Sequence, residues 1–194
     1  MGPLALHMAT HIILMNGIAP IAVIALRHLG FQARPAESGA LVTATALQLL
    51  LLWGWHAPPL LNEAIQSAAI HLLMQASLFA AAFYFWSSAL AFEGNQRWKP
   101  IFALLVTSKL FCLLGVLFVF SPRMLYLGLL EHLHGGEAML VTTLADQQLA
   151  GLLMLATCPV TYVVGGILVA NRWLTEIDDE GSRADAALPP ARVE

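Results

Sequence analysis

The stretch IFALLVTSKLFCLLGVLFVF, residues 101–120, contains a single charged residue, Lys109, in an otherwise continuous apolar run. A helix needs about 20 predominantly apolar residues to cross a bilayer, so this stretch predicts a transmembrane helix. The composition supports the same interpretation, because 59% of the 194 residues are hydrophobic and 11% are charged, whereas average globular proteins carry about 25% charged residues. These numbers exclude an ordinary soluble domain and indicate a multi-pass membrane protein.

Apolar runs of comparable length lie on both sides of this stretch. The expected spans are Leu4 to Leu29, Gly39 to Trp55, Ser67 to Phe92, Ile101 to Phe120 and Ala145 to Leu174. Five spans predict an all-α, polytopic transmembrane helix bundle that occupies residues 1–175 as one domain. Residues 176–194 are acidic and then rich in alanine and proline, and we expect them to form a disordered cytoplasmic tail.

Basic residues near the ends of these spans predict the orientation of the chain. An odd number of spans places the two termini on opposite sides of the membrane. Only Arg123 falls on one side, and the basic residues on the other side are Arg27, Arg34, Arg97, Lys99 and Arg172. The positive-inside rule then predicts an N-terminus outside and a C-terminus in the cytoplasm. The net charge of -3 offers no basic patch, so no nucleic-acid partner is expected.

Histidines gather in the outer half of this predicted topology. Ionisable groups inside a membrane are costly, and by default they mark a function or a partnered contact. Four of the seven histidines fall near the outer ends of the first three spans, and these are His7, His11, His56 and His71. Two more, His132 and His134, fall in the outer loop before the last span. The shared depth of the first four predicts that they converge.

The first span adds methionines to these imidazoles. Met8, His11 and Met15 are three and four residues apart and therefore share one helical face. Thioether and imidazole groups are the ligands expected for soft Cu(I). The candidate metal ligands are His7, Met8, His11, Met15, His56, His71, Asp146 and Met154, with His132 and His134 as mobile first contacts. A methionine stripe is also typical of ordinary core packing, and Asp146 also has an explanation as a helix N-cap.

Lys109 lies near the middle of its span, where a charge costs at least about 2.5 kcal/mol. We expect it to be buried beside polar groups of neighbouring helices, with Asn16, Gln48 and Gln75 as candidates. A structural polar cluster is the favoured interpretation, and a charge that holds an anionic group is the alternative. A protonated ammonium has no lone pair for a metal, so Lys109 is not expected to bind copper.

Several short motifs occur in a fixed order along the chain. They are His7-Met-Ala-Thr-His11 with Ala19-Pro20, Trp55-His-Ala-Pro58 with Leu61-Asn-Glu-Ala64, His71 with Phe85-Trp86, Leu114-Gly115 with Ser121 through Leu125-Tyr126, and Asp146-Gln-Gln-Leu-Ala-Gly-Leu-Leu-Met154. The ordered set resembles the CtaG-type cytochrome c oxidase assembly factors, which are membrane proteins associated with copper delivery to haem–copper oxidases. The resemblance implies a copper-linked role at the outer face of the bacterial inner membrane and transfers to His7, His11, His56, His71, Asp146 and Met154. Members usually carry a further histidine where this chain has Gln75.

We therefore expect an assembly factor that binds Cu(I) near the periplasmic face and delivers it to a cytochrome c oxidase subunit. Another copper chaperone, membrane lipid and a second copy of the chain are further expected partners. No nucleophile–base set, P-loop or Rossmann fingerprint is present in the sequence, so no enzymatic activity is expected. The alternative is a cytochrome b-like electron-transfer subunit, in which histidines on different helices bind haem b. A scaffold that binds no metal also stays open.

Overall fold

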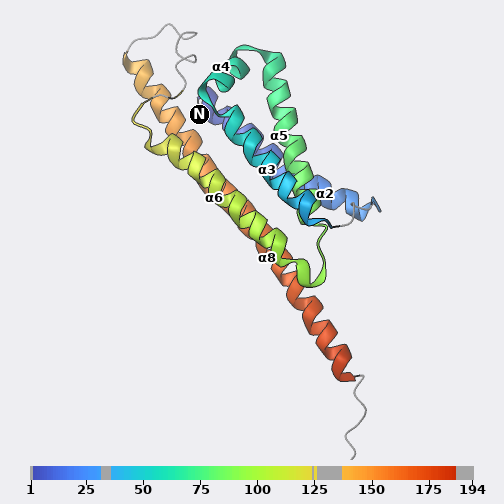
Figure 1. Ribbon diagram of the computed structural model, residues 1–194. Coiled ribbons are helices and arrows are strands. Elements are labelled where there is room, and N and C mark those ends of the chain that lie inside the picture. The colour runs from blue at the N-terminus through green and yellow to red at the C-terminus, as the bar shows by residue number, and fades with distance from the viewer. Residues whose placement is uncertain (1, 32–35, 124, 126–136, 187–194) are drawn as a thin grey trace, which may run out of the picture.

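The structure, a computed structural model, describes residues 2–31, 36–123, 125 and 137–186. Within these ranges the regular elements are helices, and they form an elongated bundle (Figure 1). Among the described residues, five segments are long and apolar enough to cross a membrane, namely Pro3–His28, Ser38–Trp55, Ala68–Ala89, Gly94–Phe120 and Leu144–Asp178. The predicted all-α, five-span architecture is confirmed.

The first span consists of α1 (Pro3–Ile12), a π-helical segment η1 (Ile13–Ile18) and α2 (Ala19–His28). Pro20 explains the irregular middle of this span, because proline has no N–H and its ring crowds the carbonyl four residues earlier. Beside this segment, the Met15 carbonyl accepts a hydrogen bond from Trp86 Nε1 at 3.2 Å. The irregular turn is therefore fixed by a buried side chain of another helix.

The second and third spans are α3 (Ser38–Trp55) and α5 (Ala68–Ala89), and the short α4 (Pro58–Gln66) connects them. Proline suits the first turn of a helix, and Pro58 begins α4 directly after α3 has ended. The hydroxyl of Ser67 caps α5 by accepting the Ile70 N–H at 3.5 Å. Figure 1 shows α4 at the same end of the bundle as the N-terminus of the chain.

The remaining spans are α6 (Trp98–Phe120), which follows the 3-10 turn η2 (Gly94–Gln96), and the long α8 (Glu137–Ala186). These two helices lie side by side along the length of α6 (Figure 1). Gly115 and Gly151 allow their close approach, because a Cβ atom on Gly151 would lie 2.7 Å from the Gly115 carbonyl oxygen. Small residues at such crossings are a common basis of helix packing in membranes.

Aromatic side chains fill the middle of the bundle around Tyr162 of α8. The Tyr162 ring is stacked on Trp86 with centroids 5.6 Å apart, and it also contacts Phe85 and Phe111. Its buried hydroxyl accepts a hydrogen bond from Gln48 Nε2 at 2.6 Å, which satisfies a polar group that would otherwise be costly in this core. The three polar residues expected to be partners of Lys109 are buried, namely Asn16, Gln48 and Gln75.

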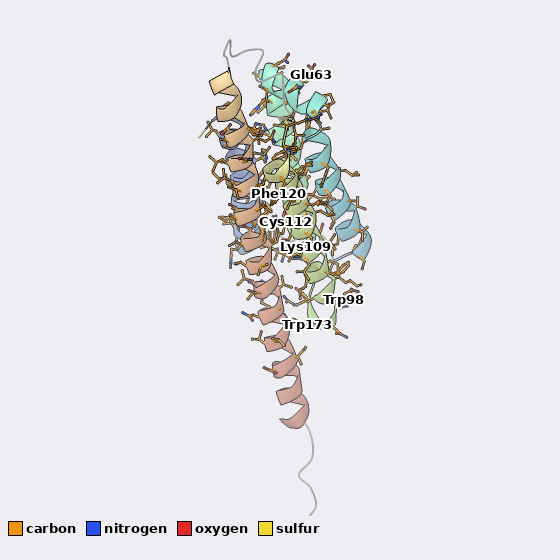
Figure 2. All side chains as sticks on the ribbon, turned by 90° about the vertical axis from the view of Figure 1, so that its left-hand side faces the viewer. Glu63, Trp98, Lys109, Cys112, Phe120 and Trp173 are labelled. Carbon is orange, nitrogen blue, oxygen red and sulfur yellow. The ribbon has the colours of Figure 1, made fainter. Side chains whose placement is uncertain are left out.

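Lys109 itself is exposed, which corrects the expectation that it is buried among these groups. Its neighbours Thr107 and Ser108 face the bundle, as does Phe111. Each residue of a helix is turned by about 100° from the one before it, so Lys109 falls on the opposite side of α6. Figure 2 shows Lys109 along α6 between Trp98 and Cys112.

The end of α8 also differs from the expected disordered tail, because the helix continues to Ala186. Extension of an existing helix avoids the nucleation step that makes isolated helices marginal. At the start of this segment, Glu176 forms a bidentate ion pair with Arg97 and accepts the Gly94 N–H at 3.1 Å. Glu176 therefore ties the turn before α6 to α8, and residues 187–194 of the expected tail lie outside the described residues.

Candidate functional site

Four imidazoles from three parts of the chain form a continuous row at the end of the bundle that carries α4. His7 and His11 lie on α1, His56 follows α3, and His71 lies on α5. The ring centroids are 5.1 Å apart for His71 and His7, 5.0 Å for His7 and His11, and 5.2 Å for His11 and His56. We call these four residues the histidine cluster. The sequence placed them at one depth, and the structure brings them into contact.

His56 has the most defined geometry in the histidine cluster. Its Nδ1 lies 2.6 Å from the Leu52 carbonyl oxygen, and its Nε2 lies 3.3 Å from Met8 Sδ. A carbonyl oxygen can only accept, so Nδ1 carries the proton and the Nε2 lone pair of the neutral ring faces the thioether. Burial lowers the pKa of His56 to about 4, although the hydrogen bond to Leu52 acts in the opposite direction. At neutral pH, two electron-pair donors therefore face each other here.

The two histidines of α1 are buried without the hydrogen bonds that buried polar groups usually have. His11 is 1% exposed, and His7 is 8% exposed. Among the described residues, neither ring nitrogen of His11 has a hydrogen-bond partner, and His7 Nε2 also has none. Most buried polar atoms in proteins are hydrogen-bonded, and exceptions call for a physical explanation such as a redox role or an ion.

His71 marks the accessible side of the histidine cluster. It is half-buried, and its Nε2 lies 3.5 Å from Gln75 Nε2, one helical turn further along α5. His71 and His7 line an open depression of about 300 Å³ together with residues of α1 and α4 that include Pro3, Thr10 and Ile65. The row of imidazoles thus runs from an open side at His71 to a buried side at His56.

Asp146, a candidate ligand from the sequence, is engaged in hydrogen bonds with the start of α1. Its carboxylate accepts backbone N–H groups from Gly2 at 2.6 Å, Leu4 at 2.8 Å and Ala5 at 3.3 Å. The first turn of a helix leaves its N–H groups without internal partners, and a carboxylate is a favourable acceptor for them. Asp146 therefore caps α1 from another helix, instead of capping its own helix, which already begins at Glu137.

Met15 of the first span and Met154 of α8 are both buried, and these two helices pack against each other. Asp146 lies beside Leu4 and Cys158 lies beside Asn16, so α8 runs parallel to the first span in constant register, from 146 to 158 against 4 to 16. This register places Met154 at the depth of Ile12, directly next to His11 in sequence. Met15 lies a turn deeper than His11. Among the described side chains, neither methionine forms a hydrogen bond with a histidine of the cluster.

The donor atoms do not already surround a single point. Within the ranges that the structure describes, no group of three or more His, Cys, Asp or Glu side chains is arranged to hold a metal ion. The imidazoles instead meet edge to face, with interplanar angles of 67° to 79°. His132 and His134, expected as first contacts, lie outside the described residues.

Sequence reasoning missed the groups that hold His56 in place. One is the Leu52 carbonyl, which stands four residues before His56, and the other is the Phe118 ring, whose centroid lies 5.9 Å away. The four-residue spacing is a usable signal for the first, because a helix end commonly directs its last carbonyls toward residues of the next turn. No local signal exists for Phe118, which comes from a distant helix.

The fold and the histidine cluster define a class of protein: a five-span helical membrane protein with neighbouring imidazole and thioether donors at one end of the bundle. Over residues 3–176 the chain matches the family model described as cytochrome c oxidase caa3 assembly factor, Caa3_CtaG. The chain therefore belongs to this family of oxidase assembly factors. No curated protein and no solved structure gives a significant match.

Proposed function

We propose that this assembly factor binds Cu(I) at the histidine cluster and transfers it to a cytochrome c oxidase subunit. The observation that carries the proposal is the pair formed by His56 and Met8. Metal-binding histidines typically donate their other ring N–H to a carbonyl or carboxylate, which fixes the tautomer. The Leu52 carbonyl meets this requirement, and the 3.3 Å between Nε2 and Sδ is compatible with two donors to one ion.

The chemistry of the donors favours copper over other metals. Thioether sulfur is a soft ligand that suits Cu(I), whereas magnesium and calcium require oxygen ligands. Among the described residues at this end of the bundle, Asp146 is a buried carboxylate that already accepts the N–H groups of α1. The cluster therefore offers nitrogen and sulfur rather than oxygen.

His7 and His11 supply further donors whose burial supports the same proposal. A ring nitrogen without a hydrogen bond in an apolar interior loses the solvation that it had in water. A bound cation would compensate for that loss. Because no described group holds His11 Nδ1 or Nε2 or His7 Nε2, these rings can turn toward an ion without breaking a hydrogen bond. Rotation of these rings would direct the ring nitrogens of the edge-to-face row toward one ion.

The arrangement along the row supports transfer as well as binding. Cu(I) would first meet His71 and His7 at the open depression and then exchange onto His11, His56 and Met8. Each move replaces one ligand by another, with no change in the oxidation state of copper. Release to an acceptor protein follows the same ligand exchange in reverse, so the proposed role requires no enzymatic turnover.

In this proposal, the histidine cluster lies on the periplasmic side of a bacterial inner membrane, and the distribution of basic residues supports this orientation. Arg27, Arg97 and Lys99 lie at the end of the bundle opposite the cluster, and Arg172 of α8 is close enough to Arg27 for the two charges to interact. The positive-inside rule assigns that end to the cytoplasm. Copper would then be received from another copper chaperone, or transferred to an oxidase subunit, outside the cytoplasm.

Anaerobic titration of the purified protein with Cu(I) against a competing chelator tests the proposal. We expect His7→Ala and His11→Ala each to weaken binding by at least about tenfold, a loss typical of disturbed metal sites. His28→Ala is the matched control, because His28 is exposed at the opposite end of the first span. Equal affinity in all three variants would remove the histidine cluster from copper binding.

The absorbance spectrum of the same sample distinguishes the alternative function. A Soret band that disappears in His11→Ala would identify a haem-binding, cytochrome b-like protein. Neither a Soret band nor bound copper would leave a scaffold that assists oxidase assembly without metal.

A further inference from the structure

Lys109 is exposed on the outer side of α6, in the middle of a membrane span. Its neighbours on that side are large and apolar, with Phe102 63% exposed, Leu105 50% exposed and Leu113 52% exposed. Among the described residues, Lys109 forms no hydrogen bond, ion pair or cation–π contact. The bundle therefore presents a basic group to its surroundings at the depth where a bilayer is most apolar.

Lys109 cannot relieve this position by extending toward water. It is eleven residues from each end of α6, from 98 to 109 and from 109 to 120, which corresponds to about 16 Å of helix on either side. A lysine has a stem of only four carbons, so its ammonium does not reach either membrane surface. Charged side chains inside membranes typically pair with one another or with other polar groups.

An apolar groove includes Phe102 and Val106 of α6 in its lining, and Val106 is about one helical turn from Lys109. It has a volume of about 530 Å³ and runs between α3 and α6, with Val42, Leu49, Phe102 and Val106 among its walls. Val106 precedes Lys109 by three residues, so the two side chains share a helical face. The groove ends in Lys99 near the start of α6.

We propose that this groove receives a transmembrane helix of another protein, and that a carboxylate on that helix pairs with Lys109. Apolar side chains of the incoming helix would fill the groove, and the charge pair would fix its depth. Charge complementarity selects the carboxylate, because in apolar surroundings a basic group is stabilised chiefly by an opposite charge.

A second copy of this chain does not provide the required carboxylate. The described spans contain acidic residues only at their ends, namely Asp146, Glu176 and Asp178. Asp146 caps α1 and Glu176 pairs with Arg97, and none of the three lies at the middle of a span. The partner is therefore a different protein. This inference goes beyond the proposed copper site and does not depend on it.

Site-specific photo-crosslinking in cells tests the inference. The full chain would carry p-benzoylphenylalanine in place of Phe102 in the groove, or in place of the exposed Leu168 of α8 as a matched control. We expect the Phe102 position alone to yield a cross-link to one other membrane protein. Mass spectrometry should map it to a transmembrane segment that contains Asp or Glu.

Variants of Lys109 then test the charge pair. Lys109→Met and Lys109→Glu should abolish the cross-link, and Lys109→Arg should retain it. The melting temperature of the purified protein should stay unchanged in Lys109→Met, because Lys109 forms no polar contact within the described bundle. The proposal is overturned by a cross-link to a second copy, to lipid only or to a helix without a carboxylate, by no cross-link at all, or by full retention in Lys109→Met.

Discussion

The carboxylate of Asp146 lies 2.6 Å from the backbone nitrogen of Gly2, although 144 residues separate them in sequence. The same side chain also accepts the N–H groups of Leu4 and Ala5, so α8 fixes the first turn of α1. His7 and Met8 belong to the next turn. The position of the histidines on α1 thus depends on a carboxylate of another helix.

We therefore predict that Asp146→Ala lowers the stability of the protein by about 1–2 kcal/mol, the upper range for loss of a helix cap. The reason is that buried N–H groups of α1 lose their acceptor. Thermal unfolding in detergent measures the effect, with Asp178→Ala as the control because Asp178 is exposed. Copper affinity should fall less than in His11→Ala, and the number of bound copper ions should not change. Loss of one bound copper would return Asp146 to the ligand set.

The contact between Met8 and His56 leads to a second prediction. Met8→Leu keeps a buried apolar side chain of similar size but removes the sulfur, so we expect weaker Cu(I) binding by at least about tenfold with little loss of stability. Met15→Leu is the matched substitution deeper in the same span and should leave the affinity unchanged. A stronger effect of Met15→Leu would place the site deeper in the bundle than His56.

Acid should destabilise the copper-free protein through His56. Its pKa in the folded protein is about 4, below the ordinary value of 6.5, so the unfolded chain binds more protons between these two values. Stability consequently rises with pH across this window. The contribution of neutral His56 to stability is fully present above pH 6.5 and is lost as the pH falls toward 4. Melting temperatures measured in detergent over this range should show the decrease.

His56→Gln tests the origin of this dependence, because glutamine cannot titrate and can still donate to the Leu52 carbonyl. We expect a smaller change of melting temperature with pH in His56→Gln than in the unmodified protein. His28→Gln should keep the original dependence, since His28 is exposed at the other end of the span. The same dependence in His56→Gln would assign the effect to other groups.

The close approach of α6 and α8 gives a prediction on packing. Gly151→Ala would place a Cβ 2.7 Å from the Gly115 carbonyl oxygen and 2.9 Å from Phe118 Cβ, so the two helices must separate. We expect a loss of about 1–3 kcal/mol, as for other overpacked sites, measured by thermal unfolding. Gly166→Ala is the control within the same helix, because a Cβ there meets nothing within 4 Å. Equal melting temperatures of the two variants would show that the bundle adjusts at this crossing without cost.

The number of spans and the grouping of the histidines followed from local sequence, because span length and depth depend only on position along the chain. The direction in which Lys109 faces did not, since α6 is apolar on all sides and its sequence has no polar stripe that marks the outer face. The local sequence also did not predict that Asp146 binds the backbone N–H groups of α1. A carboxylate that opens a span predicts a cap, and only the packing of α1 against α8 decides which helix it caps.

The orientation of the bundle is the last prediction, and it follows from the basic residues at the end opposite the histidine cluster. We expect the α4 end to face the periplasm and the end of the last span to face the cytoplasm. Glu63 of α4 and Asp178 of α8 are both exposed, and Figure 2 shows Glu63 at the end of the bundle opposite Trp173. In intact cells, a membrane-impermeant maleimide should label Glu63→Cys but not Asp178→Cys. Asp178→Cys should become reactive once the inner membrane is permeabilised. The native Cys112 and Cys158 lie within spans and should stay unlabelled by this reagent in both samples, so the unmodified chain serves as the background control. The reverse pattern would place the histidine cluster in the cytoplasm, where copper could not be handed over at the outer face.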